Sequence, residues 1–457
     1  MGEPIAVSLA RWVVSFEAED LAPRERLLAR ARLLDTVGLA AAGMRAPSIA
    51  AVWRWTAGQS TGVGSVLLGT GLRVSPALAA FAHGAAAHVL DFDDTLPASV
   101  VHPGSIVVPV ALAVGEAWRR DSAEVLAAIA IGYEVAARIG AAFGTPLHTR
   151  GFHPSGVVGP LAAAATAARL LGLDAQQTAQ ALGLAASTAG GLMTFLVDGS
   201  GSKAFHCGWA AHAGITTAQL AAAGFPGPTS VLDGPVNLFD AFGRSSNSTD
   251  LTAALGRDWQ GSTAEFKYFP GAHVIHPFIA AALALRADGV TAASVRRICC
   301  TVPRWGFGVV CEPRAAKLAP RSSADVIASL PYLVAAAFVD GACTPATLEP
   351  TAFARPEALV LASKIECVPD DAAARFGGTL QVELQNGSRR TLDVALPRFD
   401  EPRLRGKFRA NVGADRLLQL ERLLDAAIID LSAIFECLGR ERTVSSPTTR
   451  SASIGVQ

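Results

Sequence analysis

The sequence predicts a mainly α protein, in which a large all-helical domain formed by both chain ends carries an inserted, smaller α+β lid domain. Residues 7 to about 265 form successive amphipathic, Ala-rich segments separated by Gly, Pro and Ser. β-Branched and alternating patterns begin only after about residue 290, and helical patterns return at about residue 404. These changes predict three segments: 1–268 as the first part of the helical domain, 269–400 as the lid, and 401–457 as the helical return.

The elements follow in chain order. Helical periodicity is clearest over 24–39, 75–90 and 123–143. In the lid, β-branched residues favour a strand over 295–302, and weak alternation favours another over 358–368. Residues 379–396 predict a hairpin, because apolar residues alternate on both sides of Asn386-Gly387, a pair that suits the positive φ angles of a tight turn. Helices are expected again over 417–424 and 428–438, before a polar tail over 445–457.

Composition excludes several classes of protein. The 457 residues include 39 Lys+Arg and 39 Asp+Glu, so the formal net charge is zero, and 51% of residues are hydrophobic. A nucleic-acid-binding protein normally carries a basic excess, and a disordered chain is polar and charged. The longest apolar runs are short or broken by Pro160 or Arg169, and no signal peptide is recognisable. We therefore expect a cytoplasmic protein that binds neither nucleic acid nor membrane.

Cysteine, histidine and lysine are distributed unevenly. The seven cysteines show no C-x-x-C spacing, so neither a disulfide framework nor a zinc or iron–sulfur site is indicated. All nine histidines lie between residues 83 and 276, and only five of the 39 basic residues are lysines. The region that holds the histidines is therefore where we expect the chemistry.

Two loops share a His-Pro step before an Ala-rich helix. They read His102-Pro-Gly-Ser and His153-Pro-Ser-Gly. A helix N-terminus offers free N–H groups and a positive dipole end, which attract carboxylates and favour a neutral histidine. The same step could equally serve only to end one helix and begin the next.

The run Asp91-Phe-Asp-Asp-Thr95 follows an apolar helix that contains His88. One interpretation is a carboxylate that orients a proton-transfer group or accepts a proton beside His102. The other is a capping cluster for the next helix, because Asp and Thr are good N-caps. A magnesium site would need a further acidic group, so no metal is expected.

Two lysines lie in motifs rich in small residues. Lys203 ends the loop 198–203, in which Ser202 precedes it, and a lysine beside Gly and Ser amides suits a carboxylate. Lys267 precedes an aromatic residue, a proline and then His273. In the lid, Ser329-Leu-Pro-Tyr332 begins an apolar helix, where Tyr332 could pack in the core or face the site.

In combination, these motifs resemble the MmgE/PrpD family over nearly the whole chain. The resemblance rests on Leu90-Asp-Phe-Asp-Asp-Thr95, Gly151-Phe-His-Pro154, Gly201-x-Lys203, Lys267-x-x-Pro270, Ser329-x-x-Tyr332 and Arg405-Gly-Lys407-Phe408. It implies a helical domain with a lid, a homodimer, and an active site between the domains without metal or other cofactor. The residues that it implies for this site are Asp91, Thr95, His102, His153, Lys203, Lys267 and Tyr332.

This sequence differs from the family pattern in two places. The segment from Thr95 to His102 is one residue longer than in the decarboxylases of the family. After Pro270, Gly271-Ala-His273 stands where the dehydratases have a Cys-Cys-Arg type of run. We therefore add His273 and Ser202 to Lys267 and Thr95 as expected substrate-binding residues, and expect a smaller or less charged acid than a tricarboxylate.

The reactions of the family make or protonate a carbanion next to a carboxylate. Cations must hold the acid and stabilise the developing enolate, while an acid and a base move the proton. Lys203 and Lys267 suit the cationic role, His102 and His153 beside Asp91 suit proton transfer, and Tyr332 suits a donor from the lid. The expected activity is that of a lyase on a small polycarboxylic acid, with dehydration of a 2-methylcitrate type of substrate first. Decarboxylation, epimerisation and non-catalytic carboxylate binding remain alternatives.

Overall fold

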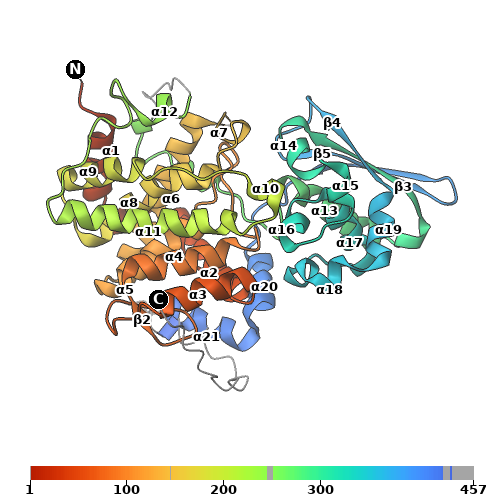
Figure 1. Cartoon of the computed structure of the whole chain (residues 1–457), viewed down its shortest axis with the longest axis horizontal. Helices are drawn as coiled ribbons and strands as arrows, with labels where there is room; N and C mark the ends of the chain where they lie inside the picture. The colour runs from red at the N-terminus through yellow and green to blue at the C-terminus, as the bar shows by residue number, and fades with distance from the viewer. Residues whose placement is uncertain (1, 145, 244–250, 426–432, 435–457) are drawn as a thin grey trace, which may run out of the picture.

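A computed structural model describes residues 2–144, 146–243, 251–425, 433 and 434, and the chain in it forms two lobes (Figure 1). One lobe is built almost entirely of helices and contains the N-terminus. The other holds a small sheet with short helices around it. The mainly α class with a smaller α+β part is thereby confirmed.

The helical lobe contains the first twelve helices and a two-stranded ribbon. Its elements are α1 (Ile5–Ser15), α2 (Pro23–Gly43), α3 (Pro47–Ala57), β1 (Ser65–Val66), β2 (Arg73–Val74), α4 (Pro76–His88), α5 (Gly104–Ala117), α6 (Ser122–Phe143), α7 (Pro146–Thr149), α8 (Pro154–Leu171), α9 (Ala175–Ala186), α10 (Phe195–Asp198), α11 (Ser202–Ala222) and α12 (Leu238–Ala241).

Local chemistry explains where these helices begin. The side chain of Ser75 accepts the amide of Leu78 at the start of α4, and Asp121 accepts that of Glu124 at the start of α6. Such N-caps satisfy donors that have no partner inside the helix. Helices α4, α5, α8 and α11 pack against one another, and the buried faces of α4, α8 and α11 are rich in alanine, whereas that of α5 is rich in valine. Small side chains let the axes of α4, α8 and α11 approach closely.

One described helix is long and apolar enough to cross a membrane. It is α6, and 83% of its most apolar window is buried inside the protein. Its neighbours are α8, α2 and α5 of the same lobe. The apolar character of α6 therefore matches its position in the core.

The second lobe, which covers the segment predicted to be a lid and keeps that name below, carries a four-stranded sheet with strand order β4-β3-β5-β6. Its elements are α13 (His276–Ala287), β3 (Val295–Pro303), α14 (Arg304–Val310), α15 (Arg314–Leu318), α16 (Ser323–Ile327), α17 (Leu330–Asp340), α18 (Pro350–Phe353), α19 (Pro356–Ser363), β4 (Ile365–Asp370), β5 (Gly377–Leu384) and β6 (Arg389–Ala395). Strand β3 pairs with β4 in parallel and with β5 antiparallel, and β5 pairs with β6 antiparallel.

The predicted hairpin is confirmed, with a different turn. Gly387 has φ +83°, but Asn386 is not among the described residues with positive φ. The amide of Gly387 donates to Leu384 O, and that of Leu384 donates to Ser388 O. A three-residue connection with a glycine bulge therefore replaces the two-residue turn that the Asn-Gly pair predicts.

One strand prediction was partly wrong. Residues 358–368 divide between helix α19 and strand β4, because the apolar spacing at the start of this segment suits a helical face as well as a strand. The strand over 295–302 is confirmed as β3, and the helix after Ser329 is confirmed as α17.

The chain returns to the helical lobe after β6. Helix α20 (Glu401–Val412) packs on α2, and α21 (Ala414–Asp425) follows it (Figure 1). Phe408 lies against Gly38 of α2, where an added Cβ would be only 2.5 Å from the ring. The helix expected over 428–438, apart from residues 433 and 434, and the tail over 445–457 lie outside the described residues.

Candidate active site

A cavity of about 960 Å³ lies between the two lobes. The helical lobe contributes residues from α4, α11 and the loops before α5 and α8. The lid contributes residues before α13, from α14 and α16, and around Phe376. Cavities of this size and position are typical of small-molecule sites.

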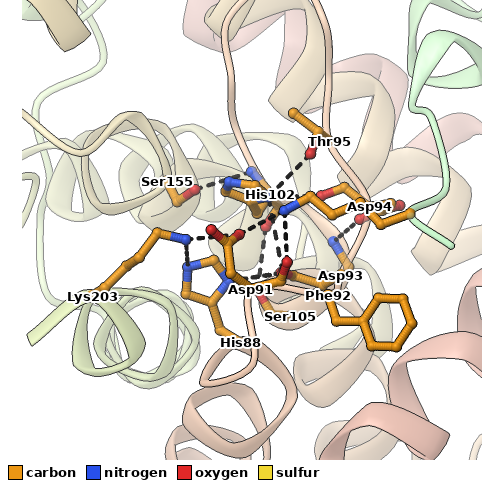
Figure 2. A network of polar contacts seen from close by, with 12 residues as sticks. His88, Asp91, Phe92, Asp93, Asp94, Thr95, His102, Ser105, Ser155 and Lys203 are labelled. Carbon is orange, nitrogen blue, oxygen red and sulfur yellow. Dashed lines mark hydrogen bonds and ion pairs between the residues drawn. The ribbon is translucent and has the colours of Figure 1, made fainter. Parts of the chain in front are cut away.

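The aspartate run follows α4 directly, and its first residue, Asp91, lines this cavity. Asp91 adopts a left-handed backbone, with φ +48°, and its amide donates to His88 O. Thr95 pairs with Glu265 in an isolated antiparallel bridge, which brings the segment containing Lys267 alongside the run. The three aspartates are all buried and have three different partners (Figure 2).

Asp91 holds both lysines that the sequence singles out. Its Oδ1 lies 2.9 Å from the Nζ of Lys203 and 2.6 Å from that of Lys267, which also donates to Asp91 O. Burial alone would raise the pKa of Asp91, but Lys203 and Lys267 hold it well below its usual range. Lys267 is completely buried, whereas Lys203 lines the cavity. Lys203 is therefore the ammonium that a bound molecule can contact.

Asp93 orients His88, and His88 in turn contacts Lys203. The Nδ1 of His88 lies 2.8 Å from Asp93 Oδ2, and its Nε2 lies 3.1 Å from Lys203 Nζ. An ammonium can only donate, so Nε2 is the acceptor and Nδ1–H donates to Asp93. Burial lowers the pKa of His88, which agrees with this neutral form. Lys203 therefore donates to His88, and His88 donates to Asp93. These hydrogen bonds, which all run in one direction, form a directed chain whose Lys203 end lines the cavity (Figure 2).

His102 has an equally defined form. Its Nδ1 lies 2.8 Å from Asp94 O, a pure acceptor, so Nδ1 carries the proton and Nε2 has a free lone pair. Thr95 Oγ1 lies 3.3 Å from the same nitrogen, and the amide of His102 donates to Ser155 Oγ. Burial, with a contribution from Lys267, lowers the pKa of His102 well below its usual range. His102 lines the cavity as a neutral base.

His153 is the N-cap residue of α8 and faces the other two imidazoles. Its ring centroid is 5.5 Å from that of His88 and 6.1 Å from that of His102. Its Nδ1 lies 3.2 Å from His206 Nδ1, while its buried Nε2 has no hydrogen-bond partner among the described residues. Burial, followed by Lys203, lowers the pKa of His153 well below its usual range. Both expected His-Pro loops thus place a neutral histidine at the cavity.

Asp94 performs the capping role that the sequence left open. Its Oδ1 accepts the amide of Gly104, the first residue of α5, at 2.9 Å, and its Oδ2 accepts the hydroxyl of Tyr133 at 2.6 Å. Burial raises the pKa of Asp94 to about 6. The two interpretations of the aspartate run therefore both apply, to different residues: Asp93 orients a histidine, and Asp94 caps the next helix.

The structure brings together most of the expected site residues. Those in or directly behind the cavity wall are Asp91, Thr95, His102, His153, Lys203, Lys267 and, from the lid, His273. Ser202 contacts Ser200 and is not among the described lining residues. Tyr332 is completely buried in the lid core near Arg355, and burial raises its pKa to about 12. The structure therefore does not bring Tyr332 to the cavity, because the apolar face of α17 packs inward.

Sequence reasoning missed four residues. His88 and Asp93 complete the chain to Lys203, and a histidine just before an aspartate run is the signal that could have identified them. Arg45 lines the cavity mouth without a distinctive motif. Lys407 of α20 donates to Phe92 O at 2.8 Å and to Lys267 O at 2.9 Å, and pairs with Asp35 at 2.7 Å. The C-terminal return thus supports the site from behind.

Two groups of side chains have metal-compatible spacing. Ligand atoms of His88, His102 and His153 lie within 4.8 Å of one another, as do those of Asp91, Asp93 and His102. However, the Nδ1 atoms of His88 and His102 are already bonded, and Lys203 lies against the free nitrogen of His88. A cation placed there would face the ammonium groups of Lys203 and Lys267, so the arrangement favours an anion.

Comparison with known proteins agrees with this architecture. Residues 7–250 match the MmgE/PrpD N-terminal domain, and residues 269–422 match the MmgE/PrpD C-terminal domain. A cis-aconitate decarboxylase of Homo sapiens is 30% identical over 421 residues, which cover 85% of this chain and 84% of that protein. The cis-aconitate decarboxylase-like protein oryM of Aspergillus oryzae is 27% identical, with coverage of 93% and 91%. A cis-aconitate decarboxylase of Mus musculus is 28% identical, with coverage of 92% and 88%.

Proposed function

The chain belongs to the MmgE/PrpD family and is a lyase of that family, and we propose that it releases CO₂ from an unsaturated carboxylic acid. The observation that carries this proposal is the directed chain Asp93–His88–Lys203, whose Lys203 end lines the cavity, with His102 beside it. The relatives named above favour decarboxylation over the dehydration that the sequence alone suggested.

The reaction needs one proton for each CO₂ released. The C–C bond to the leaving carboxylate breaks, and its electron pair moves through the double bond towards a second carboxylate, which becomes enolate-like. A proton then adds to a carbon atom of the enolate, and the new C–H bond takes the place of the C–C bond that was broken. The protein must therefore stabilise the enolate oxygens and deliver a proton to one carbon.

Lys203 is suited to the electrostatic part of this reaction. Its ammonium group has three N–H bonds, of which one meets His88 Nε2 and one meets Asp91. The third remains for a carboxylate oxygen of the substrate. Because the surrounding histidines are buried and neutral, little water competes, and this charge acts in a low dielectric.

His102 is suited to proton transfer. Its free Nε2 can take a proton when an anionic substrate lies beside it, because a neighbouring negative charge favours the protonated imidazole and opposes the effect of burial. It can then give this proton to carbon. His153, with an unpartnered Nε2 in the same wall, is the second candidate donor. Thr95 and Asp94 O act on His102 by fixing its ring and tautomer.

Dehydration of a hydroxy acid is the second candidate function. It is supported by the presence of a neutral base, His102, and an ammonium acid, Lys203, in the same cavity wall. Such a pair could remove a proton from carbon and protonate the departing hydroxyl. Epimerisation would need bases on both faces of one carbon, for which His102 and His153 are the candidates.

The test is turnover of unsaturated and hydroxy acids in D₂O, followed by NMR. The proposal expects loss of CO₂ with one deuterium placed on carbon. Loss of water would establish the dehydratase, and deuterium exchange without loss of either molecule would establish the epimerase. Thermal stabilisation by these acids without any turnover would contradict an enzymatic role and favour carboxylate binding.

Two variants test the assigned residues. Lys203→Met and His102→Gln are each expected to lower kcat at least about 10²-fold, the usual scale for a proton-transfer or charge-stabilising group. Lys364→Met is the matched control, because it makes the same substitution at a lysine that is not among the described lining residues. The Nζ of Lys364 donates to Val295 O in the lid. Unchanged turnover in both site variants would refute the assignment.

We further propose that the protein acts as a cytoplasmic homodimer. The free thiols of the six described cysteines suit a reducing compartment. An exposed aromatic stripe on α11 supports a second copy as partner: Phe205 and Trp209 are 48% and 42% exposed and stack at 5.8 Å. Large exposed aromatic patches are typical of interfaces.

A further inference from the structure

We infer that the substrate is a dicarboxylic acid that carries an apolar group of several carbons in place of a third carboxylate. This inference rests on the proposed function, because it assigns the reacting carboxylates to the region of Lys203. It goes beyond that function by assigning the remaining part of the substrate. Three observations carry it: the size of the cavity, the charge of its wall, and the apolar side chains in that wall.

The cavity is much larger than a small polycarboxylate requires. Its volume of about 960 Å³ lies near the upper end of the range, roughly 300–1,000 Å³, that accommodates drug-sized ligands. The polar network of His88, Asp91 and Lys203 supplies only a few of the residues that line the cavity. An acid of a few carbons bound at this network would leave much of the cavity unfilled.

The charges in the described part of the wall cancel. Lys203 and Arg45 are its two lysine or arginine residues, and Asp91 and Glu349 are its two carboxylates. Behind the wall, Lys267 and Asp93 are both buried and carry opposite charges that act on each other, although Lys267 pairs directly with Asp91. The five histidines of the lining do not add charge where burial lowers their pKa, as it does for His88, His102 and His153.

This balance limits the charge of the substrate. One carboxylate can take the remaining N–H of Lys203, and a second can reach Arg45, which no described carboxylate pairs with. A third carboxylate would enter a partly desolvated space without a cation of its own. Burying an unpaired charge is unfavourable, so a tricarboxylate is disfavoured.

Much of the cavity wall is apolar. Its apolar lining includes Phe195 and Leu196 of α10, Trp305 and Val309 of α14, Ile327 of α16, and Phe376 before β5. Helices α10 and α16 lie where the two lobes meet (Figure 1). Trp305 packs edge-on against Phe376, with their ring centroids 5.3 Å apart, and Phe376 contacts His273. An alkyl chain or aromatic ring in this space would replace water against apolar surface, which is favourable.

Binding of unreactive acids tests the inference apart from catalysis. The probes are 2-methyl-, 2-butyl- and 2-hexylsuccinate, compared with tricarballylate, by isothermal titration calorimetry. We expect Kd to fall about four-fold for each of the first added methylenes, because burial of one CH₂ group usually strengthens binding by about this factor. We expect tricarballylate to bind at least ten-fold more weakly than 2-butylsuccinate. Equal affinity across the alkyl series, or tighter binding of tricarballylate, would overturn the inference.

Two variants locate the apolar group. Leu196→Gln is expected to reduce the gain per methylene to less than two-fold, and Val309→Gln provides the same test from the lid if the first variant fails to fold. Val197→Gln is the control, because Val197 neighbours Leu196 but is 86% exposed and outside the described lining. If Kd still fell about four-fold per methylene in both lining variants, the assignment of the apolar group to this wall would be contradicted.

The result separates this inference from the proposed function. A strong alkyl preference in binding, with no turnover of any unsaturated or hydroxy acid that bears the same alkyl group, would refute the lyase chemistry and leave the inference intact. Decarboxylation of small unsubstituted acids, with no alkyl preference, would do the opposite.

Discussion

Asp91, Asp93 and Asp94 are close in sequence, but each has its own chemical role. Asp91 balances two ammonium groups, Asp93 orients an imidazole, and Asp94 caps a helix. Asp91 adopts a left-handed backbone, a conformation that Asp tolerates better than most residues. Substitutions in the run should therefore have effects that differ in kind.

Asp93→Asn should lower activity with little effect on folding. An asparagine can donate its amide proton to His88 Nδ1, which would move the ring proton to Nε2 and oppose the N–H of Lys203. We expect kcat to fall at least ten-fold and the melting temperature to change by only a few degrees. Asp371→Asn is the control, because the Asp371 side chain is 73% exposed and pairs only with Arg304 among its assigned contacts. Full activity of Asp93→Asn would show that the His88 tautomer does not matter.

Asp94→Asn should change how stability depends on pH. Burial raises the pKa of Asp94 to about 6 from 3.8, so the folded protein binds this proton more tightly than the unfolded chain. The resulting stabilisation is present below pH 4 and is lost as the pH rises through 6. Relative to the Asn variant, wild type should lose up to about 3 kcal/mol of unfolding free energy between pH 4 and 7.

Urea unfolding at four pH values between 4 and 7 measures this difference. Asp94→Asn removes the titrating proton, and its amide oxygen can still accept from Gly104 N. The hydrogen bond from the Tyr133 hydroxyl is lost in the variant, which shifts its stability by an amount that does not change with pH between 4 and 7. A constant difference between the two proteins over this range would mean that Asp94 has an ordinary pKa in the folded state.

At the scale of elements, the alanine-rich helices pack through glycine. At Gly214 of α11, an added Cβ would lie 2.3 Å from Ala163 Cβ and 2.5 Å from Ala164 N of α8. These two helices form the most extensive contact between elements. Since α11 carries Lys203 and α8 begins at His153, their close approach sets the distance between these two site residues.

Gly214→Ala should therefore destabilise the protein, and Gly406→Ala should stabilise it. The first substitution forces α11 and α8 apart, at a cost of about 1–3 kcal/mol for overpacking. The second lies inside α20 with no atom within 4 Å of the added methyl group, so it gains the helix propensity of alanine, about 0.5–1 kcal/mol. Chemical denaturation of both variants measures the two effects. Equal effects of the same sign would refute the close packing at Gly214.

The same comparison explains what could be predicted at this scale. Helices α2, α4 and α6, strand β3 and the β5–β6 hairpin follow from local periodicity, turn residues and caps. The division of 358–368 between helix and strand could not be predicted, because short apolar segments fit both patterns. The turn at Gly387 differed by one residue, since hairpin register depends on the pairing of both strands.

At the scale of the whole molecule, the candidate site depends on contacts between distant segments. His-Pro loops and lysine motifs identified His102, His153, Lys203 and Lys267 from local sequence. Arg45 and Lys407 were not assigned to the site, because their roles arise only when the segment after α2 and helix α20 meet the other site residues. His88 had a local signal, its position just before the aspartate run, that was not used. Tyr332 shows the opposite case: its motif was recognisable, but its side chain packs inside the lid.

The homodimer is tested by analytical ultracentrifugation. Wild type should sediment as two chains, and Trp209→Glu should sediment as one, because the substitution places a charge in the exposed stripe beside Phe205. Val197→Glu, at an exposed position outside α11, should leave the dimer intact. A monomeric wild type would contradict the proposal, and a dimer in both variants would exclude this stripe as the interface.

The position of Lys407 also has a consequence for how the protein is made. Lys407 follows Phe92, whose carbonyl it binds, by 315 residues. A ribosome adding 5–20 residues per second needs about 15–65 s to cover that distance. Throughout this time α2 has been synthesised without its partner helix, and Asp35 has no ammonium to pair with. The candidate site is therefore among the last parts of the nascent chain to be completed. A chain that ends before Lys407 leaves the surface of α2 exposed to chaperones and proteases, and its site lacks the contacts that Lys407 makes.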